Sequence, residues 1–598
     1  MRNRLVLSLL LILGLLNSVF ALDAHAGGVV TITDRFGSTT DPGTLAWALN
    51  GGGTVTFDCD GTITVTPAIQ INADTIIDAT GRNIILSGNN TNSVFVVLAE
   101  KKLDLIGLTI TGGAVYGGVR NVGGIVTINS CLISGNTSMY GGGIKNENWS
   151  PSSVGRMTIT NTIVSDNTAH SDGANAFGGG IYNDGTMTLT DSTVTRNSAT
   201  TITGNASTGG IHNIKNSDLL GAGSMTLTNC TVSANTAKNN GGINNTSGQL
   251  TLLNSMVVEN QSTTGDAGGI FNNRGSVILT NSSLSDNTTT HRGGGMYSYG
   301  GTIIIENSTV SNNHSDDVGG GIQTAVEATL EIRNSTISGN SATNRGGSLE
   351  SFGGLVTITN STLSGNSANQ GGGIYNYAPL NLNHVTFSGN SAVEGANLYI
   401  VHDSIRSATQ MTNTLIANAL TSSNCAGNPL FITDNGYNLA DDGTCNLTNP
   451  TSKPNTAALI NPTLANNGGY TDTHALLDGS PCIDAIPCGT NGCGGSILTD
   501  QRGISRPQGN GCDIGAFELV CETDTEPPVA REAQANPNPA KTNTIITLTA
   551  KIDDSTTGGS TIASAKYRVD DGSWMPMRAE DGVFDTSVET VRNCSKIN

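Results

Sequence analysis

Runs of glycine before an aliphatic residue are the first feature that could carry chemistry, because glycine-rich loops can cradle phosphate groups. One such run is FGGGIYN, which begins at Phe177. A phosphate loop also needs a lysine and a serine or threonine, or a third glycine opening a helix, and no Gly-Lys dipeptide occurs in the chain. Similar runs begin at Gly141, Gly241, Gly268, Gly293, Gly319 and Gly371. This recurrence indicates a repeated structural turn.

Paired carboxylates would point to cleavage of glycosidic bonds, which needs two acids flanking the bond. Within the repeats, Asp316 and Asp317 form the only Asp-Asp pair, beside His314. The pair falls in a loop, where a solvated turn is the simpler interpretation. Arg333 and Glu306 hold equivalent positions in adjacent repeats, which favours a surface ion pair over a lyase base. The sequence therefore predicts no catalytic residue and no cofactor.

The 11 cysteines concentrate near the end of the chain, eight of them at or after Cys425. Cys488 and Cys493 have no nearby histidine, so we predict disulfides rather than a metal site. Cys425 and Cys445 flank a segment without other cysteines, which favours a bridge between them. Four more cysteines, which allow three pairings, are Cys482, Cys488, Cys493 and Cys512.

The N-terminus has the pattern of a secretory signal: two arginines, an apolar run from Leu5 to Leu16, and Ala24-His25-Ala26. We therefore predict that residues 1–26 are removed and that the protein is secreted, extracellular or at the cell surface. The removal of two Arg and one Asp takes the formal charge from −19 to −20. Such acidity argues against nucleic acid or an anionic membrane as a partner, and no later segment has the apolar length of a membrane span. A monomer is expected.

A repeat runs through most of the chain and is clearest in NSTISGN, which ends at Asn340. Its final asparagine recurs about every 28 residues, the length of one coil of a three-sided parallel β-helix. The positions of this asparagine are Asn136, Asn167, Asn197, Asn235, Asn260, Asn287, Asn313, Asn340, Asn366 and Asn390. We predict that these side chains form a structural ladder at one corner, hydrogen-bonded to their like above and below.

Apolar residues occupy fixed columns of the repeat and define its walls. One column lies three residues before the asparagine, as at Ile133, and another follows the glycines, as at Ile144. Period-two alternation places both inside. Glycine supplies another corner. About four further coils precede Asn136. Tyrosines that face outward, at Tyr182, Tyr297 and Tyr375, could bind a glycan or a protein, or be solvated wall.

The tail carries the motifs TDQRG, RPQG and CDIGAFE in order, within residues 461–519. It resembles the C-terminal part of bacterial surface proteins called choice-of-anchor Q domain-containing proteins. The repeats are similar to those of chlamydial polymorphic outer-membrane proteins. The resemblance implies a right-handed parallel β-helix on an exported protein without established catalysis. It also favours a Cys493–Cys512 bridge, which would bracket the shared motifs, and leaves Cys482 to pair with Cys488.

The predicted fold class is all-β: a right-handed parallel β-helix solenoid with a disulfide-rich C-terminal cap and a partial immunoglobulin-like β-sandwich. The expected domains are the signal peptide at 1–26, the β-helix at 27–420, the cap over the last coil at 421–523, and a linker with the partial sandwich at 524–598. The residues from Pro527 onward are fewer than the roughly 100 of a full sandwich, which favours a truncated reading frame.

The function predicted from these features is that of an exported, non-enzymatic surface or extracellular β-helix protein with a role in adhesion or surface structure. Its partner would be a glycan or a protein on a host or neighbouring cell. One alternative is a polysaccharide lyase or glycoside hydrolase on a pectin-lyase-like β-helix. Another is a surface stalk whose binding domain is missing.

Overall fold

The computed structural model describes residues 27–204, 206–215, 223–401, 408–520, 527–555, 561–569, 571–581 and 583–596. The predicted signal peptide, residues 1–26, lies outside this set. The chain divides into two compact units, Met1–Leu519 and Val520–Asn598. Among the described residues, no helix has both the length and the apolar character needed to cross a membrane.

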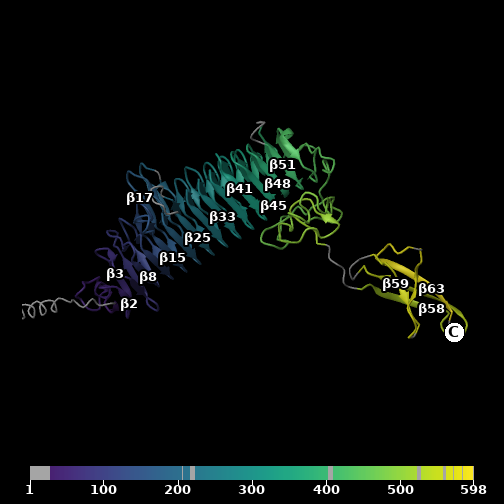
Figure 1. Ribbon diagram of the computed structural model, residues 1–598, viewed down its shortest axis with the longest axis horizontal. Helices are drawn as coiled ribbons and strands as arrows, with labels where there is room; N and C mark the ends of the chain where they lie inside the picture. Colours follow the sequence, from purple (N-terminus) through teal and green to yellow (C-terminus); the bar gives the residue numbers. More distant parts are fainter. Residues whose placement is uncertain are drawn as a thin grey trace, which may run out of the picture. The chain divides into compact units, whose positions relative to one another are not determined.

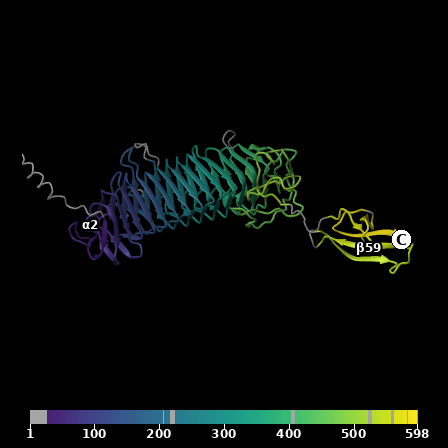
Figure 2. The same ribbon diagram turned by 60° about the horizontal axis from the view of Figure 1, so that its bottom comes forward.

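The first unit is a parallel β-helix whose coils stack in sequence order (Figures 1 and 2). A representative coil has four strands: β11 (Ile125–Asn129), β12 (Leu132–Ser134), β13 (Thr137–Ser138) and β14 (Ile144–Glu147). The first two belong to a 29-stranded sheet, the third to a 10-stranded sheet and the fourth to a 14-stranded sheet. Three sheets thus enclose one continuous core, as the periodicity predicted.

The predicted apolar columns face the core. Ile133 pairs in register with Val164 of the next coil, and Ile144 pairs with Ile181. All four side chains are fully buried in one apolar cluster that runs through the coils. Because each coil covers the apolar side chains of its neighbour, the stack supplies the burial that a single coil could not provide.

The short strand after each ladder asparagine was not predicted. In β17 (Thr168–Ser171) and β22 (Ser198–Thr201), Ala169 lies opposite Ala199. These alanines form a small buried cluster of their own with Ala176, Ala206 and Ala237. A column of alanine has weaker hydrophobic periodicity than one of valine or isoleucine, which is why the sequence pattern did not reveal this strand.

The triple glycine forms a corner, as predicted, and its first residue shows why glycine is required. Gly178 has a φ of 68°, in the left-handed region. A Cβ placed on it would also overlap the carbonyl oxygen of Ile181. Both facts exclude a larger residue without strain. The triple glycine therefore has a backbone role.

The N-terminal end of the core is covered by the one-turn helix α2 (Leu45–Ala48), which packs against β1 (Gly27–Val30). Leu45 and Ala48 are fully buried in the main core. Four rungs of the 29-stranded sheet precede β11, in agreement with the four coils expected there. Covering the first rung removes an open edge on which other strands could pair.

The C-terminal end of the core is covered by residues 441–456. The last rungs of the 29-stranded sheet are β54 (Ile432–Asp434) and β55 (Leu439–Ala440). Lys453 bridges to Leu439, and Leu447 packs against the main core. This segment matches the cap expected over the last coil.

The rest of the tail does not cap the coil but runs back along the outside of the 29-stranded sheet (Figure 1). Asn360 donates to the carbonyl of Thr499 at 2.8 Å, and Thr362 donates to the side chain of Gln501 at 2.7 Å. The expectation of a single cap is therefore corrected for this part of the tail. The tail lies there because the outer face of the 29-stranded sheet ends in the apolar residue Leu415, which the tail buries.

The second unit is an antiparallel β structure. Its main sheet has the order β58-β59-β63-β62, and Ala565, Met577 and Val591 form its small core. The strands of that sheet are β58 (Val529–Asn536), β59 (Ile545–Asp553), β63 (Val588–Lys596) and β62 (Arg578–Ala579).

Candidate functional site

The ten predicted ladder asparagines stack in one buried column between coils. Each side-chain amide from Asn136 to Asn366 donates to the Oδ1 of the next asparagine at 2.9–3.0 Å. Each Oδ1 from Asn167 to Asn390 also accepts the backbone N–H of the asparagine one coil earlier, at 2.8–3.1 Å. The donors and acceptors of the column thus satisfy one another inside the protein, so its role is structural.

The ladder continues beyond its last predicted member to the C-terminal end. Asn390 donates to Asn397 at 2.8 Å, and Asn397 donates to Asn424 at 2.6 Å. Asn424 then donates to the carboxylate of Asp441 at 2.6 Å. The Asp441 carboxylate thus accepts the last hydrogen bond of the ladder.

A second inner column of asparagines escaped the sequence analysis. Its members sit two residues after the aliphatic residue that follows the glycines, a position that the repeat shows plainly once it is aligned. Each donates to the next at 2.8–2.9 Å. The members are Asn121, Asn146, Asn183, Asn213, Asn245 and Asn272. For three coils the column then holds Ser298, Thr324 and Ser351, before asparagine returns at Asn376. The hydroxyls of Thr324 and Ser351 are buried without hydrogen-bond partners.

Two of the three predicted disulfides are present. Cys425 is bonded to Cys445 and Cys493 to Cys512. The predicted Cys482–Cys488 bridge is wrong, and both residues are free thiols. Cys482 is fully buried in the apolar cluster of the tail, whereas Cys488 is exposed. Cys482 is thus held in the tail by apolar packing and not by a disulfide.

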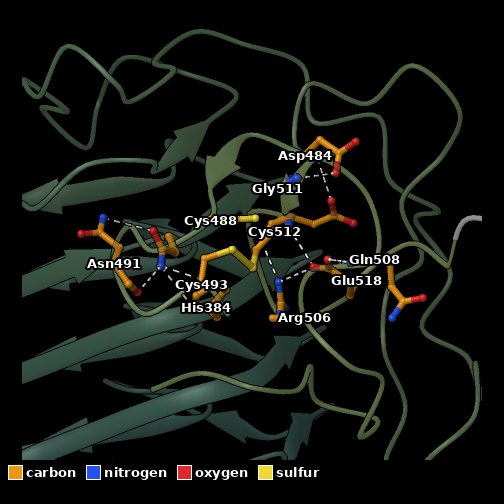
Figure 3. Close-up of a disulfide and its surroundings, with 12 residues drawn as sticks. His384, Asp484, Cys488, Asn491, Cys493, Arg506, Gln508, Gly511, Cys512 and Glu518 are labelled. Carbon is orange, nitrogen blue, oxygen red and sulfur yellow. Dashed lines mark hydrogen bonds and ion pairs between the residues drawn. A yellow bond between two sulfur atoms is a disulfide. The ribbon is translucent and has the colours of Figure 1, made fainter. Parts of the chain in front are cut away.

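The motifs behind the family resemblance have structural roles in the tail. Figure 3 shows buried Arg506 beside the Cys493–Cys512 bridge, and Arg506 donates to Glu518 at 2.8 Å. Burial raises the pKa of Glu518 to about 7, against the lowering effect of Arg506. Gln501 of TDQRG donates to the hydroxyl of Thr336 at 2.9 Å. Arg506 and Glu518 thus hold the tail together internally, whereas Gln501 fastens it to the coils.

The acid pair considered in the sequence analysis is split in the structure. Asp316 lies 3.0 Å from His314 on an exposed corner. Asp317 instead lines a hollow on the neighbouring face. Among the described residues, no cluster of histidine, cysteine and acidic side chains could hold a metal ion.

That hollow has a volume of about 650 Å³ and lies over the 14-stranded sheet. Its floor comes from three adjacent strands, β36 (Met296–Tyr299), β40 (Ile322–Ala325) and β44 (Leu349–Ser351). The outward residues of these strands, Tyr297, Gln323 and Glu350, lie in register. We call this depression the Glu350 hollow. It is the strongest candidate for a functional site, because it joins a buried charge to open space.

Glu350 is fully buried; one carboxylate oxygen accepts a hydrogen bond, and the other has no hydrogen bond and only an ion pair. Oε2 accepts from Gln323 Nε2 at 2.8 Å, and Oε1 lies 3.1 Å from Arg345 Nη2. Burial raises the pKa of Glu350 to about 7, although Arg345 and Gln323 act in the opposite direction. The amide of Gln323 is left with its Oε1 buried and without a donor. The floor thus offers an acceptor that nothing within the protein satisfies.

Two arginines border the hollow, and both have partners. Arg345 lies over the ring of Tyr375 at 5.0 Å in addition to its ion pair with Glu350. Arg292 donates to the hydroxyl of Tyr297 at 3.3 Å and lies 4.0 Å from Asp266. Cation–π and ionic contacts therefore hold both guanidinium groups against the wall.

Aromatic rings form part of the rim of the hollow. Phe352 stacks on Tyr377 with the ring centroids 5.1 Å apart, yet 48% of its surface is exposed. Tyr299 is 38% exposed. By contrast, Tyr297 and Tyr375, which the sequence singled out as outward, are almost fully buried. The accessible aromatic surface of the hollow is thus at its rim.

A second hollow of about 610 Å³ lies over earlier strands of the same sheet. Its rings pack on one another: Tyr182 stacks on His212 at 5.4 Å, and Tyr140 stacks on Phe177 at 5.7 Å. Burial lowers the pKa of His212 to about 4. The rings of this hollow therefore stack on rings of neighbouring coils.

Sequence reasoning missed Glu350 because it searched for pairs of acids. The informative signal was a departure from the repeat. The outward column that contains Tyr182 and Tyr375 mixes aromatic and polar residues, and Glu350 is the only acid among its paired members. A single buried acid in such a column marks a local function better than a pair of acids in a loop.

Comparison with known proteins concerns the fold. The family model described as a right-handed beta helix region matches residues 219–392. Pectate lyase Pel9A, known from a crystal structure, is 14% identical with a TM-score of 0.29, and the match covers 82% of this chain and 97% of that chain. No curated protein matches the chain. The family model and the stacked parallel sheets of the first unit agree on a right-handed parallel β-helix fold.

Proposed function

We propose that the protein is exported and acts at the cell surface or in the extracellular space as a non-enzymatic, glycan-binding β-helix protein with a role in adhesion. The Glu350 hollow carries this proposal, because it combines exposed aromatic rims with a buried polar floor. Sites that bind small polar ligands commonly combine these features. The signal pattern in residues 1–26 and the resemblance to choice-of-anchor Q proteins support the location.

The position of Glu350 favours binding over catalysis. A general acid must reach the oxygen that it protonates, within hydrogen-bond distance. Glu350 is fully buried, its Oε2 accepts from Gln323, and its Oε1 faces Arg345 in an ion pair. Its role on the floor is to hold Gln323 and Arg345 in place.

A polysaccharide hydrolase or lyase is the second candidate, and one observation favours it. Burial raises the pKa of Glu350 to about 7, and the nearby carboxylate of Asp317 acts in the same direction. Hydrolysis of glycosides uses two carboxylates, one of them with a raised pKa. This candidate requires Glu350 to be released from its present partners.

The test is to measure binding and cleavage together on the protein without residues 1–26. Soluble polysaccharides should retard the protein in affinity electrophoresis, with no release of reducing ends or unsaturated uronates. Product formation that Glu350→Gln abolishes would replace the proposal by the hydrolase or lyase. Retention of residues 1–26 on the exported protein would contradict the predicted signal.

A further inference from the structure

The Glu350 hollow opens where the inner asparagine column is interrupted. In earlier coils the asparagine holds the next corner, as Asn272 does by donating to the carbonyl of Gly275 at 3.1 Å. In the three coils of Ser298, Thr324 and Ser351 the side chains in this column are shorter. In the coils of Thr324 and Ser351, the corner residues Val326 and Phe352 line the hollow and are exposed. The change in one inner column and the opening of the outer face occur in the same coils.

The floor of the hollow requires a donor from outside. Glu350 holds the Nε2 of Gln323, so the Oε1 of that amide is left as a buried acceptor. A buried acceptor without a partner is destabilising. Gln323 lines the hollow, and a turn of its amide toward the opening would let a ligand hydroxyl donate to this acceptor.

The charges around the hollow disfavour a ligand that carries a carboxylate. Asp317, Glu327 and Glu350 all border it. Arg345 is paired with Glu350, and Arg292 lies near Asp266. A carboxylate ligand would have to compete for these two cations while facing three acids in a protein of net charge −19.

The rim offers flat apolar surface beside these polar groups. Phe352 and Tyr299 are both exposed at this face. A sugar ring has apolar faces that pack on aromatic rings and hydroxyls at its edge that donate hydrogen bonds. The hollow has both kinds of partner.

We infer that the Glu350 hollow binds a neutral, hydroxyl-rich sugar residue and discriminates against uronic acids. Phe352 and Tyr299 pack against the ring, and Gln323, held by Glu350, accepts a hydrogen bond from a hydroxyl. This inference rests on the proposed glycan-binding function and specifies the class of glycan.

The experiment compares neutral polymers (xyloglucan, galactomannan and dextran) with acidic ones (polygalacturonate and alginate) on the full chain without residues 1–26. Affinity electrophoresis and calorimetry should show binding of at least one neutral polymer and none, or at least tenfold weaker binding, of the acidic ones. The Phe352→Ala variant should weaken neutral binding by about tenfold. The matched control is Trp149→Ala, because Trp149 is 67% exposed and does not line the hollow.

Two more variants test the polar contacts. Gln323→Met should weaken neutral binding without creating affinity for acidic polymers, because it removes the acceptor and keeps the approximate volume. Glu327→Gln, at an exposed position on the hollow, should raise affinity for polygalacturonate at low salt and leave neutral binding unchanged. Circular dichroism confirms that each variant is folded.

The outcomes separate this inference from the proposed function. Equal or tighter binding of polygalacturonate would overturn the inference and leave glycan binding in place. Neutral binding that is unaffected in both Phe352→Ala and Gln323→Met would do the same, because the site would then lie elsewhere. An absence of binding to every polymer would overturn both proposals.

Discussion

The two inner asparagine columns show how one repeat serves two purposes. The column from Asn136 to Asn390 is unbroken through ten coils. The column that begins at Asn121 is interrupted after Asn272, with serine and threonine in three coils before asparagine returns at Asn376. Where the second column is interrupted, the outer face gains the Glu350 hollow. The stacked core and strand ladders hold the coils together, so one polar column can be given up locally for a binding site.

The two columns also differ in how well their polar groups are satisfied. Every amide in the unbroken column has partners inside the protein, whereas the hydroxyls of Thr324 and Ser351 have none. A buried polar group without a partner is destabilising. Stability therefore does not account for the change in the second column, and the hollow provides a reason for it.

The largest effect is expected at the covered end of the first column, where Cys425–Cys445 lies. Changing both residues to serine should lower the free energy of unfolding by about 3 kcal/mol, because the bridge closes a loop with a sequence separation of 20. Denaturant unfolding of the full chain measures the change. Cys488→Ser, at an exposed free thiol, should have no effect. An unchanged midpoint in the double variant would mean that the bridge does not hold the end of the ladder.

Within the unbroken column, Asn340→Leu should cost about 1–3 kcal/mol, because Asn313 and Asn366 would lose buried partners. The midpoint of denaturant unfolding reports the loss. Asn344→Leu applies the same change at an exposed asparagine and should cost less than about 0.5 kcal/mol. Equal costs at the two positions would show that the ladder adds nothing to stability.

At the hollow, the stability of the protein should depend on pH through Glu350. Burial raises its pKa from 4.5 to about 7, so the folded state holds this proton more tightly than the unfolded state. The stabilisation is present below pH 4.5 and is lost as the pH rises through 7. The unfolding free energy of the native protein, less that of Glu350→Gln, should fall by on the order of 1 kcal/mol over this range. Glu518, whose pKa is also raised, remains in both proteins and cancels. A difference that stays flat with pH would contradict the burial of a titrating carboxyl.

The smallest effect is expected in the interrupted column. Thr324→Val removes a buried hydroxyl that has no partner, so stability should be unchanged or rise by up to about 1 kcal/mol. The free energy of unfolding should fall in Asn340→Leu but stay unchanged or rise in Thr324→Val, although both variants lose a polar group. A cost above 1 kcal/mol for Thr324→Val would mean that the hydroxyl has a partner and that the two columns are alike.

Much of the β-helix could be predicted because its information is local and repeated. The spacing of Asn136 and its equivalents, the columns of Ile133 and Ile144, and the glycine corner at Gly178 each recur at every coil. Because similar coils stack on one another, residues at equivalent positions of adjacent repeats come into contact. The Cys425–Cys445 bridge was also predictable, since no other cysteine competes within its loop.

The tertiary structure alone decided where the tail lies and where the candidate site forms. Gln501 contacts Thr362 across 139 residues and Thr336 across 165 residues, and no periodicity relates these positions. The free state of Cys482 follows from its burial in the tail, which cysteine spacing did not reveal. The Glu350 hollow combines residues from several coils whose identities depart from the repeat. A repeat specifies what adjacent coils share, whereas a site depends on the positions at which they differ and on the side chains that the fold brings together there.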